Sequence, residues 1–284
     1  MKELSSGDKF NGVEQKYFEW SNQTPPPKVW TEIEAPALTA AIKEEVGNKI
    51  SDLKVLDIGV GGGKVLGLLQ ELGVKKENIT GVDINSKMLS LVQDKYPNIK
   101  LMIGDISNEN ILKNFCNEEQ FDLITASMIF NHLDDDQLKI AISNAFKLLK
   151  DGGILITLVP YPNRWDKMNT LKDTKTGYKC TEISPWGGKT TYHHRDMAQY
   201  GDYFDLSGFM EKAVVAEYEI PGREITKMPN RLLVIGKKSQ DFRDFQISNG
   251  IGVEEIDKRY YFPGSRRMRK SKAKILGIEM IGEF

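Results

Sequence analysis

The stretch VLDIGVGGGK, residues 55–64, decides the fold of this 284-residue chain. An apolar run that is typical of a buried strand leads directly into Gly59, Gly61, Gly62 and Gly63, and an amphipathic helical pattern follows. Glycines at such a turn let a ligand approach bare backbone at the start of a helix. The stretch predicts a strand, a ligand-binding turn and a helix, although a glycine loop alone fits many nucleotide-binding folds.

Strand-like and helix-like segments alternate along most of the chain. The predicted strands are 54–60, 79–84, 99–105, 121–127, 153–159, 211–220 and 231–237, and the predicted helices are 29–46, 64–72, 86–96, 108–116, 134–150 and 195–207. Most of these strands read as continuous apolar runs, which indicates burial on both faces. The pattern predicts an α/β fold with a doubly wound, mostly parallel, seven-stranded sheet.

Three additions accompany this predicted sheet. Residues 1–50 form an N-terminal lid segment and helix, and residues 51–239 form the main domain. A polar and aromatic cap insertion at 160–194 interrupts the main domain. Residues 240–284 are a basic C-terminal extension, in which 258–274 holds eight basic residues and no acidic one.

Acidic residues end the first three strands of the main domain. Asp57 lies just before the glycine turn, and Asp83 follows Gly63 by 20 residues. In such sheets ligands bind at the carboxyl ends of the strands. Asp83 can accept hydrogen bonds from both hydroxyls of a ribose, and Asp105 is placed to reach an adenine amino group. The residues alone leave a nicotinamide dehydrogenase or another nucleotide-binding protein open.

The ordered set of glycines and acids resembles the class I S-adenosylmethionine-dependent methyltransferases over about residues 52–239. FDLITASMIFNHL (121–133) and LLKDGGILIT (148–157) are similar to the family's fourth-strand and fifth-strand motifs. The resemblance implies S-adenosylmethionine as cofactor and S-adenosylhomocysteine as product. It implies these cofactor-binding residues: Asp57, Gly59, Gly61, Gly63, Asp83, Ile84, Asp105, Ile106 and Ser127.

Two sequence patterns argue against other enzyme classes that share this type of fold. A short-chain dehydrogenase needs a helical Tyr-x-x-x-Lys, and here that spacing occurs at Tyr96 and Lys100, where Pro97 breaks it. Methyltransferases that act on exocyclic base amines or protein amides often have an Asp/Asn-Pro-Pro-Tyr motif after the fourth strand. This chain has Ser127-Met128-Ile129-Phe130 there. The resemblance is therefore to the small-molecule branch, with oxygen or nitrogen as acceptor atom.

Aromatic residues gather in the lid segment and in the cap insertion. The residues predicted to bind the acceptor are Tyr17, Phe18, Trp20, His132, Tyr161, Trp165, Trp186 and Tyr192. Such residues can line an apolar or cationic acceptor pocket. They can equally pack the cap onto the sheet, and His132 can cap or pack the fourth helix.

Two of the chain's three histidines, His193 and His194, stand together in TTYHHRD (190–196). The segment resembles the Tyr-His-Arg segment of small-molecule methyltransferases. We expect His193 or His194 to act as a general base, and the resemblance favours His194, just before Arg195. Histidine suits the role because its ordinary pKa is about 6.5. Substrate orientation and an ordinary surface position are the alternatives. No metal is predicted, because adjacent histidines point apart and no cysteine cluster completes a site.

Composition limits the remaining classes of function. Lysine plus arginine (39) nearly balance aspartate plus glutamate (40), so net charge names no partner. No apolar run is long enough to span a membrane, and the first twelve residues do not resemble a secretory signal. Cys116 and Cys180 fit reduced thiols in the cytoplasm.

Two other functions stay open at this point. The basic tail, which includes Tyr260, Tyr261 and Phe262, suits an RNA methyltransferase, although a solvated extension or a contact in a homo-oligomer explains it as well. A methyltransferase-like scaffold or regulatory protein without activity is the alternative from outside the enzymes.

Overall fold

The computed structural model describes residues 12–47, 50–115, 120–160, 172–174, 177–184, 186–187, 189–195, 197–216 and 231–239. The predictions for Cys116, Tyr161, Trp165, residues 217–220 and the tail 240–284 lie outside the described residues.

Across these residues the main sheet has seven strands in the order β3-β2-β1-β4-β5-β10-β9. Their bounds are β1 (Val55–Ile58), β2 (Ile79–Asp83), β3 (Lys100–Ile103), β4 (Phe121–Ser127), β5 (Leu149–Pro160), β9 (Phe209–Ala216) and β10 (Arg231–Lys238). Strands β1 to β5 pair in parallel, and β10 pairs antiparallel with both β5 and β9. The predicted mostly parallel sheet is confirmed. Its strand order reverses between β1 and β4, where such sheets bind ligands.

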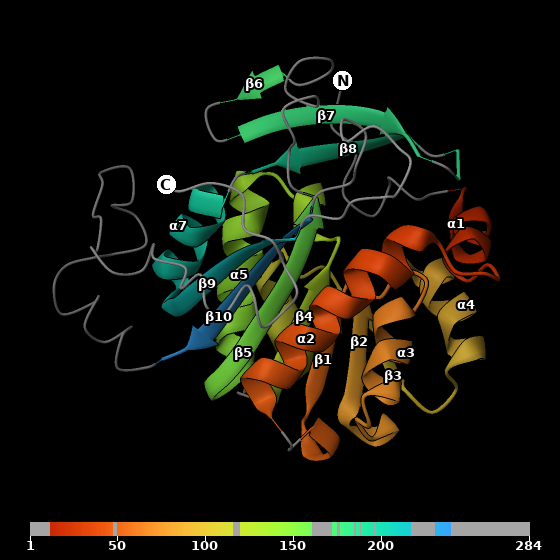
Figure 1. The fold of residues 1–284 in the computed structure, drawn as a ribbon, viewed down its shortest axis with the longest axis horizontal. Helices are drawn as coiled ribbons and strands as arrows, with labels where there is room; N and C mark the ends of the chain where they lie inside the picture. Colours follow the sequence, from red (N-terminus) through yellow and green to blue (C-terminus); the bar gives the residue numbers. More distant parts are fainter. Residues whose placement is uncertain are drawn as a thin grey trace, which may run out of the picture.

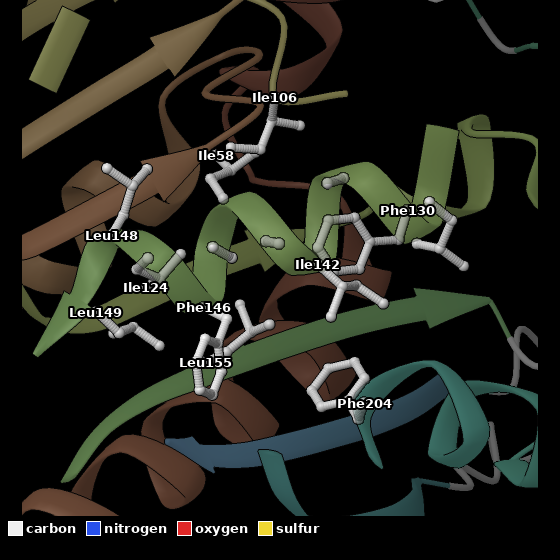
Figure 2. Packing of buried hydrophobic residues seen from close by; sticks show 14 of the residues in the cluster. Ile58, Ile106, Ile124, Phe130, Ile142, Phe146, Leu148, Leu149, Leu155 and Phe204 are labelled. Carbon is white, nitrogen blue, oxygen red and sulfur yellow. The ribbon is translucent and has the colours of Figure 1, made fainter. Parts of the chain in front are cut away.

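Helices cover both faces of the sheet (Figure 1). One face packs against α2 (Ala35–Val46), α3 (Lys64–Glu71) and α4 (Ser86–Lys95), and the other packs against α5 (Asp135–Leu148) and α7 (Met197–Ser207). Figure 2 shows the second face, where Ile142 and Phe146 of α5, Ile124 and Leu155 of the sheet and Phe204 of α7 belong to one apolar cluster. Because helices cover both faces of the sheet, its strands are buried on both sides, and this explains their apolar sequences.

Several predicted bounds shift by a few residues. The predicted helix at 29–46 begins as a π-helical segment, Trp30–Glu34, and the segment predicted as a helix at 108–116 is a 3-10 helix, Glu109–Phe115. Helix α5 ends at Leu148, because Leu149 is extended and already pairs with Phe121 as the first residue of β5.

The lid and the cap have structure that the sequence pattern did not specify. The lid contains the helix α1 (Glu14–Ser21). The cap contains an antiparallel sheet of β6 (Lys172–Thr174), β7 (Gly177–Ile183) and β8 (Lys189–His194). Figure 1 shows β7 and β8 lying over the carboxyl ends of the main strands, with α1 beside them. The segment Phe130–His132, which follows β4, contacts β8. Within the described residues, no helix has the length and apolarity to cross a membrane.

Candidate functional site

The glycine turn follows β1 and precedes α3, as its sequence predicts. The Gly59 N–H donates to the Val82 carbonyl at 2.8 Å, which fixes the turn to β2. Gly61 has φ of +50°, a conformation that favours glycine. Its N–H donates at 2.9 Å to Oδ2 of Asp83. The turn therefore holds its backbone beside the acid that ends β2.

Asp83 is held by two backbone donors. Oδ2 accepts from Gly61, and Oδ1 accepts from the Asn85 N–H at 2.9 Å. Burial raises the pKa of this carboxyl group, while the backbone donors at Asn85 and Gly61 pull it back down. Each carboxylate oxygen has a second lone pair. The group is fixed in place and can still accept two hydroxyls, as the ribose of a nucleoside cofactor requires.

Asp57 presents a buried carboxylate with one unused oxygen. The residue is 1% exposed, and its Oδ1 accepts from the Thr125 hydroxyl at 2.8 Å. Its Oδ2 has no hydrogen-bond partner among the described residues. Burial raises the pKa of Asp57 to about 7 despite the Thr125 hydrogen bond, and Asp83 adds to the rise. A buried acceptor without a donor fits the cationic amino-acid part of S-adenosylmethionine.

We expect the affinity for S-adenosylhomocysteine to rise between pH 6 and pH 8. The ammonium group of this product favours ionised Asp57, so binding near pH 7 releases a proton from a carboxyl whose pKa is about 7. The raised pKa also makes the free energy of unfolding depend on pH. The contribution of Asp57 to stability is fully present below about pH 3.8, the pKa of its carboxyl group in the unfolded chain, and is lost as the pH rises through about 7. Calorimetric titrations across this range measure the change in affinity.

The matched variant is Asp57→Asn, which keeps an oxygen for Thr125 and cannot ionise. Its affinity for S-adenosylhomocysteine should not change between pH 6 and pH 8. A pH dependence that persists in this variant would assign the proton to another group.

The remaining predicted cofactor residues differ in their surroundings. Asp105, half-buried beyond the end of β3, accepts hydrogen bonds from the backbone and the hydroxyl of Ser107 at 2.9 and 2.6 Å. Ile84 and Ser127 are half-buried at the ends of β2 and β4. The Ile106 side chain is 5% exposed and packs in the core with α5. Ile106 can therefore offer a cofactor little beyond its backbone.

Helix α1 lies directly on the glycine turn. The Asn22 side chain, just past its end, donates to the Gly62 carbonyl at 3.0 Å. A Cβ on Gly62 would stand 2.6 Å from the Ser21 Cβ, so this close approach requires glycine. The Tyr17 hydroxyl lies 3.0 Å from where a Gly61 Cβ would be, and burial, followed by Asp83, raises its pKa. Tyr17 is therefore an uncharged phenol over the turn.

An aromatic cluster joins this lid to the cap. The Trp186 ring, in the turn between β7 and β8, lies 4.9 Å from the rings of both Tyr17 and Trp20. These three residues, all predicted to bind the methyl acceptor, are therefore in contact with one another. Phe18, by contrast, packs against the apolar core on the α2–α3 side of the sheet. The prediction for Phe18 stays untested, but its packing favours a structural role.

The second group of predicted residues meets on one face of β8. The Tyr192 ring lies 5.1 Å from the ring of His132 and 5.9 Å from that of His194. Both histidines are 7% exposed. Because side chains alternate along a strand, His193 points to the opposite face and is half-buried. Of the adjacent pair, only His194 shares a face with Tyr192.

Arg195, to which sequence reasoning gave no role, anchors this face to the core. The side chain is 1% exposed, and its Nε and Nη2 donate to one oxygen of Asp135 at 2.9 and 2.8 Å. Nη2 also donates to the Leu133 carbonyl at 2.9 Å. Arg195 thereby holds the end of β8 against the loop that carries His132.

We expect Arg195→Lys to lower the free energy of unfolding by about 2 kcal/mol. A lysine keeps the charge but lacks the planar fork that serves Asp135 and Leu133 together, so a hydrogen bond to a charged group is lost. Thermal unfolding should show a decrease of roughly 4–8 °C. The control is Lys139→Met on α5, whose ammonium lies 4.0 Å from an exposed Asp136 and should contribute almost nothing. Equal unfolding temperatures for the two variants would contradict the anchoring role.

The comparisons with known proteins agree with this geometry. Residues 55–153 match the family model described as a methyltransferase domain. Protein 235L of Invertebrate iridescent virus 6 is 38% identical over 176 residues, which is 60% of this chain and 60% of that protein. The tRNA N(3)-methylcytidine methyltransferase trm140 of Schizosaccharomyces pombe is 30% identical over 132 residues, 45% of this chain and 41% of that protein. The chain thus spans less than two thirds of either relative.

A solved structure shares the fold over most of the chain. The CcbJ methyltransferase of Streptomyces caelestis aligns with a TM-score of 0.57 and 16% identity, covering 83% of this chain and all of that one. Among the described residues, no group of three His, Cys, Asp or Glu side chains could hold a metal ion.

Proposed function

We propose that this chain is a class I S-adenosylmethionine-dependent methyltransferase and that it transfers a methyl group to an oxygen or nitrogen atom of a small molecule. The supporting observation is the aromatic closure of the site. Tyr17 and Trp20 of the lid meet Trp186 of the cap above the glycine turn. A mouth closed in this way suits an acceptor of a few rings better than a nucleic-acid strand.

The residues of the chain divide the work of methyl transfer. The bound cofactor supplies an electrophilic methyl group on a sulfonium. Asp83 and Asp57 hold the nucleoside and amino-acid parts in a fixed direction, which is the alignment that an in-line displacement needs. The aromatic cluster of Tyr17, Trp20 and Trp186 excludes water from the opening of the site.

His194 is the residue that we assign to proton removal from the acceptor. It lies on the inner face of β8 beside Tyr192, on the side of the cap that meets the loop after β4. An imidazole nitrogen would take the proton of an acceptor hydroxyl as the oxygen bonds to the methyl carbon and the methyl–sulfur bond breaks. An acceptor ammonium would give up its proton to the imidazole before the attack, because its nitrogen has no lone pair until then. Tyr192 and His132 orient the acceptor.

The decisive experiment supplies purified protein with S-adenosylmethionine that has a labelled methyl group, together with a metabolite extract of the source organism. Mass spectrometry of a labelled small product identifies the acceptor and its atom. A chain that binds the cofactor and labels nothing in the extract would contradict the proposal. Failure to bind the cofactor would favour a scaffold or regulatory protein.

An RNA methyltransferase is the second candidate, because one relative acts on tRNA by its name. The basic stretch 258–274 would then guide the RNA by contacts with phosphate. Total RNA in the same labelling assay separates the two functions. Labelled RNA, with a salt-sensitive affinity that deletion of 240–284 abolishes, would replace the small-molecule proposal.

A further inference from the structure

Lys64 is a half-buried cation beside the candidate site that no step described above uses. It is the first residue of α3, directly after the glycine turn. Its Nζ lies 4.6 Å from the centre of the Trp20 ring and 5.5 Å from that of Trp30. Within the described part of the chain, its ammonium has no ion pair and no hydrogen bond. Rings satisfy only part of what an ammonium loses when it leaves water.

The charges around Lys64 leave a positive excess. Glu34 and Arg231 influence its charge, and they form a buried ion pair with each other at 2.8 Å. Glu34 is 6% and Arg231 is 7% exposed. Because this pair is already neutral, the ammonium adds one uncompensated positive charge. Burial lowers the pKa of Lys64 although Glu34 opposes the change, as expected for a cation that no carboxylate contacts directly.

The Lys64 ammonium lies on the side of the site where we place the methyl acceptor, which is the β5 side of the sheet. Arg231 pairs with Pro160 at the carboxyl end of β5. In the strand order, β5 lies on the side of β1 opposite to β2, which ends at Asp83. Trp20 contacts both the Lys64 ammonium and Trp186 of the cap. The ammonium therefore belongs to the mouth of the site and not to the ribose end.

We propose that Lys64 binds an anionic group, a carboxylate or a phosphate, of the methyl acceptor. This inference rests on the proposed small-molecule methylation and names the chemical class of its substrate. The same contacts disfavour a cationic acceptor at Trp20, because a lysine ammonium already lies over that ring. An incoming anion would give the ammonium the hydrogen-bonding partner that it lacks.

The test compares probes that differ in charge and little in shape. Benzoate, phenyl phosphate and the neutral benzamide are titrated by calorimetry into the full chain saturated with S-adenosylhomocysteine. We expect the anions to bind at least about tenfold more tightly than benzamide. Lys64→Met should abolish this preference, and Lys64→Arg should retain most of it. Equal binding of anions and benzamide, or an anion preference that survives in Lys64→Met, would overturn the inference.

The matched control is Lys95→Met. Lys95 also lies over a ring, 5.1 Å from Tyr96, but its ammonium donates to Asn22 at 2.6 Å. This variant should keep the anion preference. Thermal unfolding of Lys64→Met verifies that it folds, and a loss of folding moves the test to Lys64→Gln, read by the same criteria.

The cofactor has a carboxylate of its own, and a second pair of titrations separates the two sources. S-adenosylhomocysteine and its decarboxylated analogue are compared in wild type and in Lys64→Met. We expect the substitution to leave both affinities unchanged. If it weakens only S-adenosylhomocysteine, Lys64 pairs with the cofactor and the inference fails. Because these titrations need no turnover, they distinguish failure of the anion site at Lys64 from failure of the proposed function, which the labelling assay tests.

Discussion

Replacing Asp83 with alanine is expected to weaken S-adenosylmethionine binding at least about 100-fold. In the proposed site, the substitution removes the acceptor for two ribose hydroxyls, and hydrogen bonds to a charged group contribute about 1.5–3 kcal/mol each. It also releases the Gly61 N–H, which Asp83 holds at 2.9 Å, so the glycine turn loses its fixed position. Both consequences act on affinity for the cofactor.

Calorimetric titration with S-adenosylmethionine measures this loss. Asp52→Ala is the control, because the Asp52 side chain is 76% exposed and its partner Lys75 lies away from the turn. Its cofactor affinity should equal that of the wild type. Asp83→Asn separates the two consequences, since an amide oxygen can still accept from Gly61 but the charge is gone. An Asp83→Ala protein that binds the cofactor with unchanged affinity would contradict the assigned ribose site.

The proposed cofactor end of the site can be derived from the sequence because its residues lie close together along the chain. Asp57, the glycines and Lys64 lie within one short stretch, and Asp83 ends the next strand. A parallel sheet then brings the carboxyl ends of its strands to one edge without further information. The helical spacing of apolar residues also identifies α5. Its capping box at Asp134 and Gln137 agrees with the acidic residues predicted to begin this helix.

The acceptor end depends on contacts between distant segments, and the sequence pattern does not contain them. Trp20 and Trp186 are brought together only by the folded lid and cap. The partners of Arg195 are a carboxylate and a backbone carbonyl about 60 residues earlier. The unpaired state of Lys64 follows from Glu34 and Arg231 neutralising each other, which no local pattern reveals.

Aromatic counts alone also cannot separate substrate contacts from packing. Phe18 and Trp20 are two residues apart in the chain, and yet Phe18 packs on the apolar core while Trp20 meets the cap. The turn of a helix between them decides this difference. The same holds for Ile106, which follows the predicted adenine-binding Asp105 and is buried in the core.

Alanine at His194 is expected to lower kcat about 100-fold, whereas alanine at His193 should leave it within about threefold of the wild type. The reason is the alternation of β8, which puts His194 next to Tyr192 on the inner face and His193 on the opposite face. His193→Ala is therefore a matched control one residue away. Initial rates with the acceptor identified by labelling give kcat for both variants.

A general base and a residue that only orients the acceptor give different patterns of rate against pH. Loss of a base lowers kcat, and the remaining rate increases with pH because hydroxide and the ionised acceptor replace the imidazole. Loss of an orienting contact raises KM and leaves the pH profile of the wild type in place. A His194→Ala protein with unchanged kcat would mean that the acceptor atom is nucleophilic before it enters the site. The closed aromatic mouth and the cofactor site would then suffice for methyl transfer.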